Sequence, residues 1–278
     1  MTATPSAGSV RDALGGASEA LAAAGIEMPR LDAEVLLAEA TGWERARLAA
    51  EPEAGVPAGA GRRFGEMVRR RLRREPVAYI LGRRGFRAIE LRVDPRVLIP
   101  RPETELLVEL ALELHPSRVL DVGTGSGAVA LAIADELPEC EVVATDTSPA
   151  ALDVARANAE RLGLAGRVEL VEAMLPDPGP SFDLVVANLP YVAEADWAEL
   201  AAEVAEWEPR EALLAGPDGL EAIRATIPAA AAVASSLALE VGAGQAPAVA
   251  NLLFEAGFAE VETRPDLAGI PRVVWGRR

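Results

Sequence analysis

Residues 118–134, RVLDVGTGSGAVALAIA, join a short apolar run to a second apolar run through a glycine-rich turn. The first run predicts a buried strand, and the second predicts a helix. Gly123, Gly125 and Gly127 allow the backbone to turn sharply and to lie against a ligand without a Cβ in the way. A strand, turn and helix of this kind are typical of open α/β sheets, in which ligands bind beyond the carboxyl ends of the strands.

Apolar runs recur from residue 118 to the C-terminus, and helical segments separate most of them. The runs are RVLDVG, EVVATD, RVELVE, FDLVVAN, SLALEVG and two final runs near AEVET and RVVWG. Apolar strands that alternate with helices predict a mostly parallel seven-stranded sheet with helices on both faces. The last two runs have no room for a helix between them, so we expect them to form an antiparallel hairpin.

The residues before 76 have a helical pattern without strand alternation, which predicts a small helical domain. Ser9 is expected to cap its first helix, and EPEAGVPAGAG (residues 51–61) is expected to be a loop. The arginine-rich helix at 62–74 is interpreted as a solvated face, with contact to RNA or an acidic partner as the alternative. In FRAIELRVD (residues 86–94), apolar and polar residues alternate after an expected turn, which predicts a strand. We therefore expect domains at 1–84 and 101–278, with a β-hairpin linker at 85–100.

Composition narrows the classes of function. The 278 residues carry a formal net charge of −16. This charge argues against a protein that binds nucleic acid through clustered Lys and Arg side chains. A single cysteine and a single histidine exclude an internal disulfide and give no basis for a metal site. No apolar run is long enough for a membrane span, and the N-terminus lacks a signal-peptide pattern. We expect a cytoplasmic protein that does not contact membranes.

The glycine loop leaves more than one ligand open. GTGSGA fits the dinucleotide fingerprint, and Asp146 lies 23 residues after Gly123, where a carboxylate can accept both ribose hydroxyls. Asp121 instead suits S-adenosylmethionine, whose ammonium can lie beside a carboxylate. The third interpretation of the glycine loop is a turn that binds no ligand. Glu172 ends the next strand and either accepts from an adenine amino group or is an exposed carboxylate.

The tetrapeptide Asn188-Leu189-Pro190-Tyr191 follows the strand FDLVVAN. Taken alone, it fits an ordinary strand-to-loop turn. The Asn188 side-chain oxygen and the Leu189 carbonyl can together accept both hydrogens of an –NH2 group, because Pro190 supplies no N–H to compete. Tyr191 could pack on the planar group that carries this nitrogen. The arrangement suits methyl transfer to an amide or aryl amine.

These motifs resemble the protein-(glutamine) methyltransferases of the PrmC/HemK type over about residues 30–278. The resemblance rests on EPVAYILGRRGF, VLIPRPETELLVE, DVGTGSGAVALAIA, ATDTSPAALDVARANAERLGL, FDLVVANLPYV, WEPREALLAGPDGLEAIR and LALEVGAGQAPAV. It implies a seven-stranded class I, Rossmann-like methyltransferase domain, an N-terminal helical domain that recognises the substrate, and a connecting β-hairpin. It also implies methyl transfer from S-adenosylmethionine to the glutamine amide of the Gly-Gly-Gln loop in peptide chain release factors, the proteins that act in translation termination.

The resemblance assigns roles to individual residues. The donor would be held by Gly123, Thr124, Gly125, Ser126, Gly127, Asp146, Glu172 and Asn188. The substrate amide would be held at Asn188, Leu189, Pro190 and Tyr191. The family usually has proline where this chain has Leu189, and Glu172 and Met174 stand where an aspartate and a large residue are expected.

The remaining expectations concern the partners, an alternative activity and the roles of Glu103 and Thr104. Release factors are the expected protein partners of a monomeric enzyme, without direct binding of nucleic acid. The alternative is an adenine exocyclic-amine methyltransferase acting on RNA or DNA, because Asn-Leu-Pro-Tyr also occurs in such enzymes. Glu103 and Thr104 either cap a helix or close over the active site.

Overall fold

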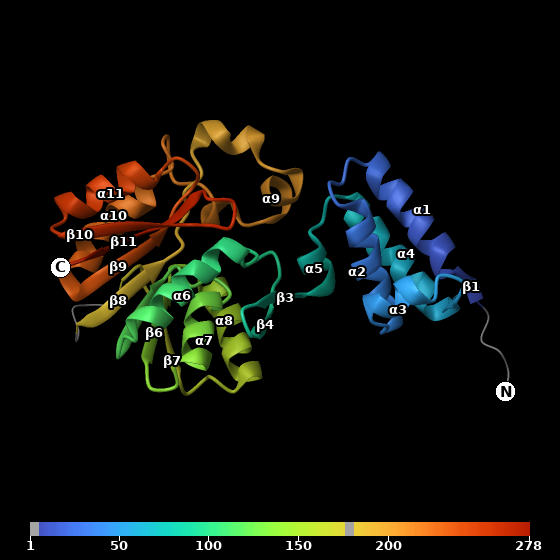
Figure 1. Cartoon of the computed structure of the whole chain (residues 1–278), viewed down its shortest axis with the longest axis horizontal. Coiled ribbons are helices and arrows are strands. Elements are labelled where there is room, and N and C mark those ends of the chain that lie inside the picture. Colours follow the sequence, from blue (N-terminus) through green and yellow to red (C-terminus); the bar gives the residue numbers. More distant parts are fainter. Residues whose placement is uncertain (1–5, 176–180) are drawn as a thin grey trace. The chain divides into compact units, whose positions relative to one another are not determined.

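The computed structural model describes residues 6–175 and 181–278, which form two compact units (Figure 1). The helical unit consists of the residues up to Gly82 together with Ala201–Trp207. The sheet unit consists of Arg83–Leu200 and Glu208–Arg278. None of the helices in these described ranges is long and apolar enough to cross a membrane.

The helical unit is built around three longer helices whose apolar faces meet. Its helices are α1 (Val10–Ala23), α2 (Pro29–Thr41), α3 (Arg45–Ala50), α4 (Ala58–Leu72), α5 (Val77–Leu81) and α9 (Ala202–Trp207). Leu14, Leu36 and Phe64, one each from α1, α2 and α4, belong to its buried core. Ser9 caps α1 as predicted, since its Oγ accepts the Asp12 N–H at 3.1 Å.

The expectation that this region contains no strand is wrong. Strand β1 (Ser6–Ser9) pairs antiparallel with β2 (Gly55–Pro57), which lies inside the segment expected to be a loop. These strands have four and three residues, which is too short for alternation to be visible in the sequence.

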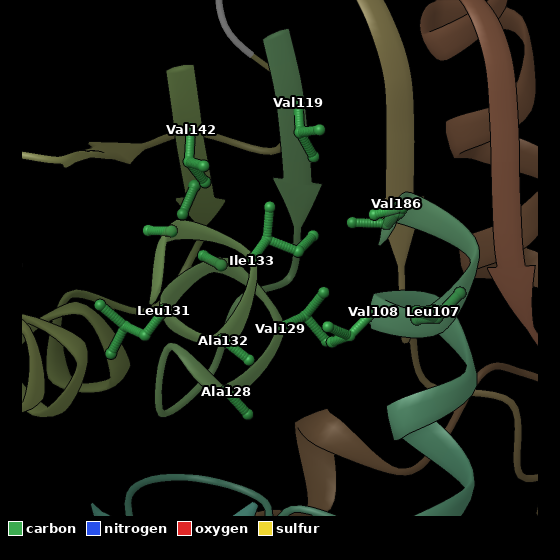
Figure 2. Close-up of a cluster of buried hydrophobic side chains, with 14 of the residues drawn as sticks. Leu107, Val108, Val119, Ala128, Val129, Leu131, Ala132, Ile133, Val142 and Val186 are labelled. Atoms are coloured by element: carbon green, nitrogen blue, oxygen red, sulfur yellow. The ribbon is translucent and has the colours of Figure 1, made fainter. Parts of the chain in front are cut away.

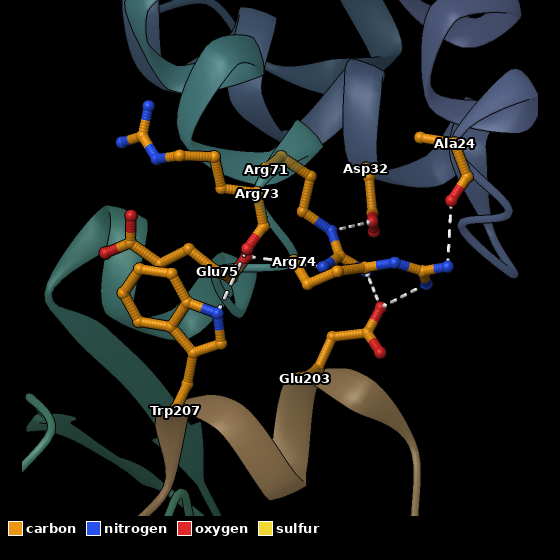
Figure 3. A network of polar contacts seen from close by, with 8 residues as sticks. All are labelled: Ala24, Asp32, Arg71, Arg73, Arg74, Glu75, Glu203 and Trp207. Carbon is orange, nitrogen blue, oxygen red and sulfur yellow. Dashed lines mark hydrogen bonds and ion pairs between the residues drawn. The ribbon is translucent and has the colours of Figure 1, made fainter.

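Helix α9 belongs to the helical unit although it lies more than a hundred residues further along the chain (Figure 3). The Arg71 guanidinium bridges Asp32 of α2 and Glu203 of α9, with both contacts at 2.7 Å. The Arg71 side chain is only 8% exposed. The Trp207 indole N–H donates to the Arg73 carbonyl at 3.1 Å. A buried guanidinium therefore holds the returning segment on the helical unit.

The sheet unit contains a hairpin and a seven-stranded sheet (Figure 1). The hairpin pairs β3 (Arg83–Phe86) with β4 (Ile89–Arg92). The sheet has the order β10-β11-β9-β8-β5-β6-β7. Its strands are β5 (Arg118–Val122), β6 (Glu141–Asp146), β7 (Val168–Glu172), β8 (Phe182–Ala187), β9 (Ala234–Glu240), β10 (Glu260–Pro265) and β11 (Pro271–Arg277). The predicted seven strands and the antiparallel pairing of the last two are confirmed.

Helices cover both faces of this sheet. The helices are α6 (Glu105–Leu114), α7 (Ala128–Glu136), α8 (Pro149–Leu162), α10 (Glu221–Val233) and α11 (Ala246–Glu255), with 3-10 turns η1 (Pro102–Thr104), η2 (Glu194–Glu199) and η3 (Arg210–Ala212). Val119 of β5 lies in a core with α6 and α7, which Figure 2 shows. The next residue, Leu120, lies in the other core, with α10 and α11. This alternation fixes the face that each strand residue covers.

We predict that Arg71→Ala destabilises the helical unit by about 3 kcal/mol, because it leaves Asp32 and Glu203 without their buried cation. Urea unfolding followed by circular dichroism measures the loss. Arg11→Ala removes an exposed pair with Glu53 and is the matched control, expected to cost about 0.5 kcal/mol or less. Equal costs for the two variants would contradict the role given to Arg71.

Candidate functional site

The carboxyl ends of four adjacent strands meet at one edge of the sheet. Val122 of β5 pairs with Thr145 of β6 and with Ala187 of β8, and Ala187 pairs with Leu239 of β9. The next residue along each strand therefore falls on one line across the sheet. We call this line the edge row; it consists of Gly123, Asp146, Asn188 and Glu240.

A cavity of about 350 Å³ opens at this edge. Gly123, Asp146 and Asn188 of the edge row line it, and so do Asp121 and Thr104. Parallel pairing thus brings the glycine loop, the candidate ribose carboxylate and the candidate amide holder to one pocket, as expected for ligand sites in open α/β sheets.

The glycine loop leaves room on the cavity side. A Cβ on Gly123 would lie 3.3 Å from Leu189 Cδ2, so the lack of a side chain lets Leu189 pack against the loop. Gly125 has a φ of +55°, and a Cβ there would meet no described atom within 4 Å. Its surroundings are open, and its N–H donates to Asp146 Oδ2 at 2.9 Å. The loop therefore leaves space beside the cavity, which side chains at positions 123 and 125 would occupy. We call this part of the loop the donor cradle.

Asp146 has acceptor capacity left for a ribose. Its Oδ2 accepts the Gly125 N–H, and its Oδ1 accepts the Ser148 N–H at 2.8 Å. A carboxylate offers about four acceptor sites, so two remain after these bonds. The two backbone donors fix the carboxylate plane, which prepares it to accept a pair of hydroxyls.

Asp121 is a buried carboxyl behind the loop. Its Oδ2 accepts the Thr124 hydroxyl at 2.7 Å and the Ala130 N–H at 3.1 Å. Burial raises the pKa of Asp121 to about 6, and these two hydrogen bonds lower it less than burial raises it. The negative charge of Asp146 raises the pKa further. A cation in the cavity would relieve both effects, which suits a ligand with an ammonium group.

Three residues of the tetrapeptide line the cavity, and the fourth lies outside the lining. Asn188, Leu189 and Pro190 line the cavity, and Asn188 Nδ2 donates to Thr104 Oγ1 at 3.0 Å. Tyr191 lies outside the lining and is half-buried, with its hydroxyl donating to Glu240 Oε1 at 3.3 Å. Burial and the Glu240 charge raise the pKa of this phenol. Gln245 holds the Tyr191 carbonyl at 2.9 Å.

The adenine side of the cavity differs from the expectation. Ala173 and Met174 line the wall, whereas Glu172 is exposed and is not part of the lining. Thr124 and Ser126 line the cavity beside the glycines. Gly127 is not part of the lining, and it caps the N-terminus of α7 with a φ of +84°. The structure therefore gathers most of the expected donor residues, with Glu172 and Gly127 outside the wall.

Two carboxylates near the site were not singled out from the sequence. Glu208 accepts the Ile99 N–H at 3.0 Å and pairs with Arg101, so it holds the loop that contributes Val97, Leu98 and Pro100 to the cavity. Glu240 ends β9 directly after the apolar residues Leu237, Ala238 and Leu239, and it is 2% exposed. The signal for Glu240 was available, because a carboxylate inside a buried strand is rare without a partner.

Two family models and several curated proteins match this chain. The family models "PrmC N-terminal domain" and "Methyltransferase domain" match residues 12–82 and 119–207. A release factor glutamine methyltransferase of Moorella thermoacetica is 45% identical, over 95% of this chain and 96% of that protein. One of Geobacter sulfurreducens is 41% identical, over 100% and 99% of the two chains.

Solved structures agree on the fold. The hMettl16 catalytic domain, crystallised in complex with MAT2A 3'UTR hairpin 6, matches with a TM-score of 0.56 at 16% identity. The match covers 67% of this chain and 75% of that one. At this identity the likeness extends to the fold alone, which is that of a Rossmann-like methyltransferase domain.

We predict that Asp121→Asn changes how stability depends on pH. In the wild type, the folded-state pKa of about 6 exceeds the ordinary value of 3.8, so this carboxyl favours the folded state below pH 4. That contribution is lost as the pH rises through 6, by about 3 kcal/mol in total for two pKa units. The stability of Asp121→Asn minus that of the wild type should rise between pH 4 and 6 and stay level above 7. A difference that is flat with pH, in urea unfolding, would contradict the assigned cause.

Proposed function

Because the chain belongs to the release factor glutamine methyltransferase family, we propose that it methylates peptide chain release factors. The methyl group passes from S-adenosylmethionine to the side-chain amide nitrogen of the glutamine in the Gly-Gly-Gln motif. The observation that carries this proposal is the edge row, because it sets a donor cradle and an amide-binding side chain side by side at one cavity.

The cavity residues fit the methyl donor. When bound, the donor supplies an electrophilic methyl carbon on a positively charged sulfur. Asp146 would accept its ribose hydroxyls, the backbone of residues 123–126 would lie along it, and Asp121 would face its ammonium group. Met174 would pack on its adenine ring. Glu172 remains a proposed acceptor for the adenine amino group, although it is exposed in this structure.

Asn188 and Leu189 would hold the substrate amide. The lone pair of an amide nitrogen is delocalised, so this nitrogen is a weak nucleophile. If the Asn188 Oδ1 and the Leu189 carbonyl accept its two hydrogens, the lone pair turns toward the methyl carbon. The nitrogen becomes positive as the new bond forms, so the two acceptors bind the transition state more strongly than the ground state. After the transfer, the nitrogen would carry the methyl group, both hydrogens and a positive charge, so it would be acidic and would lose one proton to water without a strong base.

The helical unit would contribute substrate recognition. We propose that the domain expected over residues 1–84 binds the body of the release factor, while the hairpin expected over 85–100 connects it to the methyltransferase domain over 101–278. We further propose that the enzyme acts as a monomer in the cytoplasm.

Labelled methyl transfer tests the function. The protein is incubated with methyl-labelled S-adenosylmethionine and either a release factor, the same factor with Gln→Ala in its Gly-Gly-Gln motif, or ribosomal RNA. We expect label in the first factor only. Label in RNA alone would favour the adenine methyltransferase reading, and label in none of the three would refute both.

Asn188→Ala is expected to lower kcat by about 10²–10³-fold, the usual loss on removing one group that stabilises a developing charge. The affinity for the methyl donor, measured by calorimetry, should change less than threefold, because the donor cradle is intact. Asn251→Ala, at an exposed position of α11, is the matched control and should match the wild type. Retained turnover in Asn188→Ala would overturn the role of this amide.

A further inference from the structure

Gln245 extends from the start of α11 to the tetrapeptide and has no part in the chemistry described above. It stands at the N-terminal cap of α11, yet its side chain makes no capping hydrogen bond to that helix. Its Nε2 instead donates to the Tyr191 carbonyl at 2.9 Å, across 54 residues of sequence. The side chain therefore serves the tetrapeptide rather than its own helix.

Two backbone groups fix the orientation of the Gln245 amide. Its Oε1 accepts the Gly242 N–H at 2.9 Å, while its Nε2 donates to the Tyr191 carbonyl. A backbone N–H can only donate, and a backbone carbonyl can only accept. The rotated amide would oppose both partners, so Gln245 joins the loop after β9 to the tetrapeptide in one orientation only.

Two glycines allow this close approach. A Cβ on Gly219 would collide with the Tyr191 carbonyl oxygen and would lie 2.8 Å from Gln245 Nε2. A Cβ on Gly242 would lie 3.0 Å from Gln245 Oε1 and 3.2 Å from Tyr191 Cδ2. Backbone therefore packs against both ends of the Gln245 amide, which leaves the amide little room to move.

Tyr191 is held at three points. Its carbonyl accepts from Gln245, and its hydroxyl donates to Glu240 at 3.3 Å. The N–H of the next residue, Val192, donates to the Leu213 carbonyl at 2.9 Å. Tyr191 is therefore an anchor of the main chain, which agrees with its position outside the cavity lining.

The cavity-lining part of the tetrapeptide lies between two anchors. Ala187, the last paired residue of β8, precedes it, and Tyr191 follows it. Only residues 188–190 lie between, and the Pro190 ring fixes one of their backbone angles. Among the described residues, no hydrogen bond ends on the Leu189 carbonyl. The direction of this carbonyl therefore depends on the two anchors.

We propose that Gln245 is a positioning residue that fixes the Leu189 carbonyl through Tyr191, so that this carbonyl faces the substrate amide. The inference rests on the proposed function, because the carbonyl is one of the two groups assigned to the glutamine amide hydrogens. Asn188, the other group, is held separately by its hydrogen bond to Thr104. Loss of the Gln245 contact would therefore release one acceptor and leave the donor cradle in place.

The first test removes the Gln245 amide without shortening the side chain. Gln245→Met loses both hydrogen bonds and should lower kcat for the release factor about tenfold, the equivalent of one hydrogen bond. The affinity for the methyl donor, measured by calorimetry, should change less than threefold, because Gln245 is not part of the cavity lining. Asn251→Met, at an exposed position of α11, is the matched control and should match the wild type in both measurements.

A pH series separates positioning from general damage. In Gln245→Glu, one carboxyl oxygen still accepts the Gly242 N–H, but the other can donate to the Tyr191 carbonyl only when it is protonated. The kcat of this variant relative to the wild type should be about tenfold low at pH 8 and should rise severalfold toward pH 5. Asn251→Asp adds the same charge to the same helix, and its relative kcat should not vary with pH.

The proposed function and the positioning role fail in different ways. A wild type that does not label the normal factor refutes the proposed function. A wild type that labels it, together with a folded Gln245→Met variant of unchanged kcat, refutes the positioning role alone. If Gln245→Met does not fold, the Gln245→Glu series decides. A relative kcat of Gln245→Glu that is flat between pH 8 and 5 would also refute the positioning role, because the donated hydrogen bond would then be irrelevant.

Discussion

Parallel pairing of β5 with β6 and β8, and of β8 with β9, is the constraint on which the site depends. Because the strands run in one direction, their carboxyl ends share an edge, and the register decides which residues meet there. A shift of one residue in β8 would replace Asn188 by Ala187 or Leu189 in the edge row. The apolar alternation within each strand opposes such a shift, since it would exchange the residues of the two cores.

The same edge carries two carboxyls in unfavourable surroundings. Burial raises the pKa of Asp121 to about 6 and that of Glu240 to about 7. Both lower the stability of the empty protein at neutral pH, and each lies next to a group assigned to binding, the glycine loop or Asn188. Residues that weaken the fold and adjoin a binding site are expected where function requires charge or fixed orientation.

Much of the sheet unit could be predicted because its strands are apolar runs separated by helices, and parallel topology follows from that pattern. The pocket residues Gly123, Asp146 and Asn188 could be placed for the same reason. The β1–β2 pair could not be predicted, because its strands are too short to show alternation. The contact between α9 and Arg71 could not be predicted either, because Glu203 lies 132 residues from Arg71 in the sequence. Neither the hydrogen bond from Tyr191 to Glu240 nor the one from Asn188 to Thr104 follows from periodicity, because each depends on side-chain orientation.

The central claim is that the Asn188 amide is held in one orientation, with its nitrogen on Thr104. Nuclear Overhauser measurements on protein with labelled asparagine and threonine methyl groups test this most directly. The account predicts a strong signal between the Asn188 Hδ2 protons and the Thr104 methyl group, with slow exchange of the hydrogen-bonded Hδ2 proton. Rapid exchange of both protons with water, without a signal to Thr104, would contradict it.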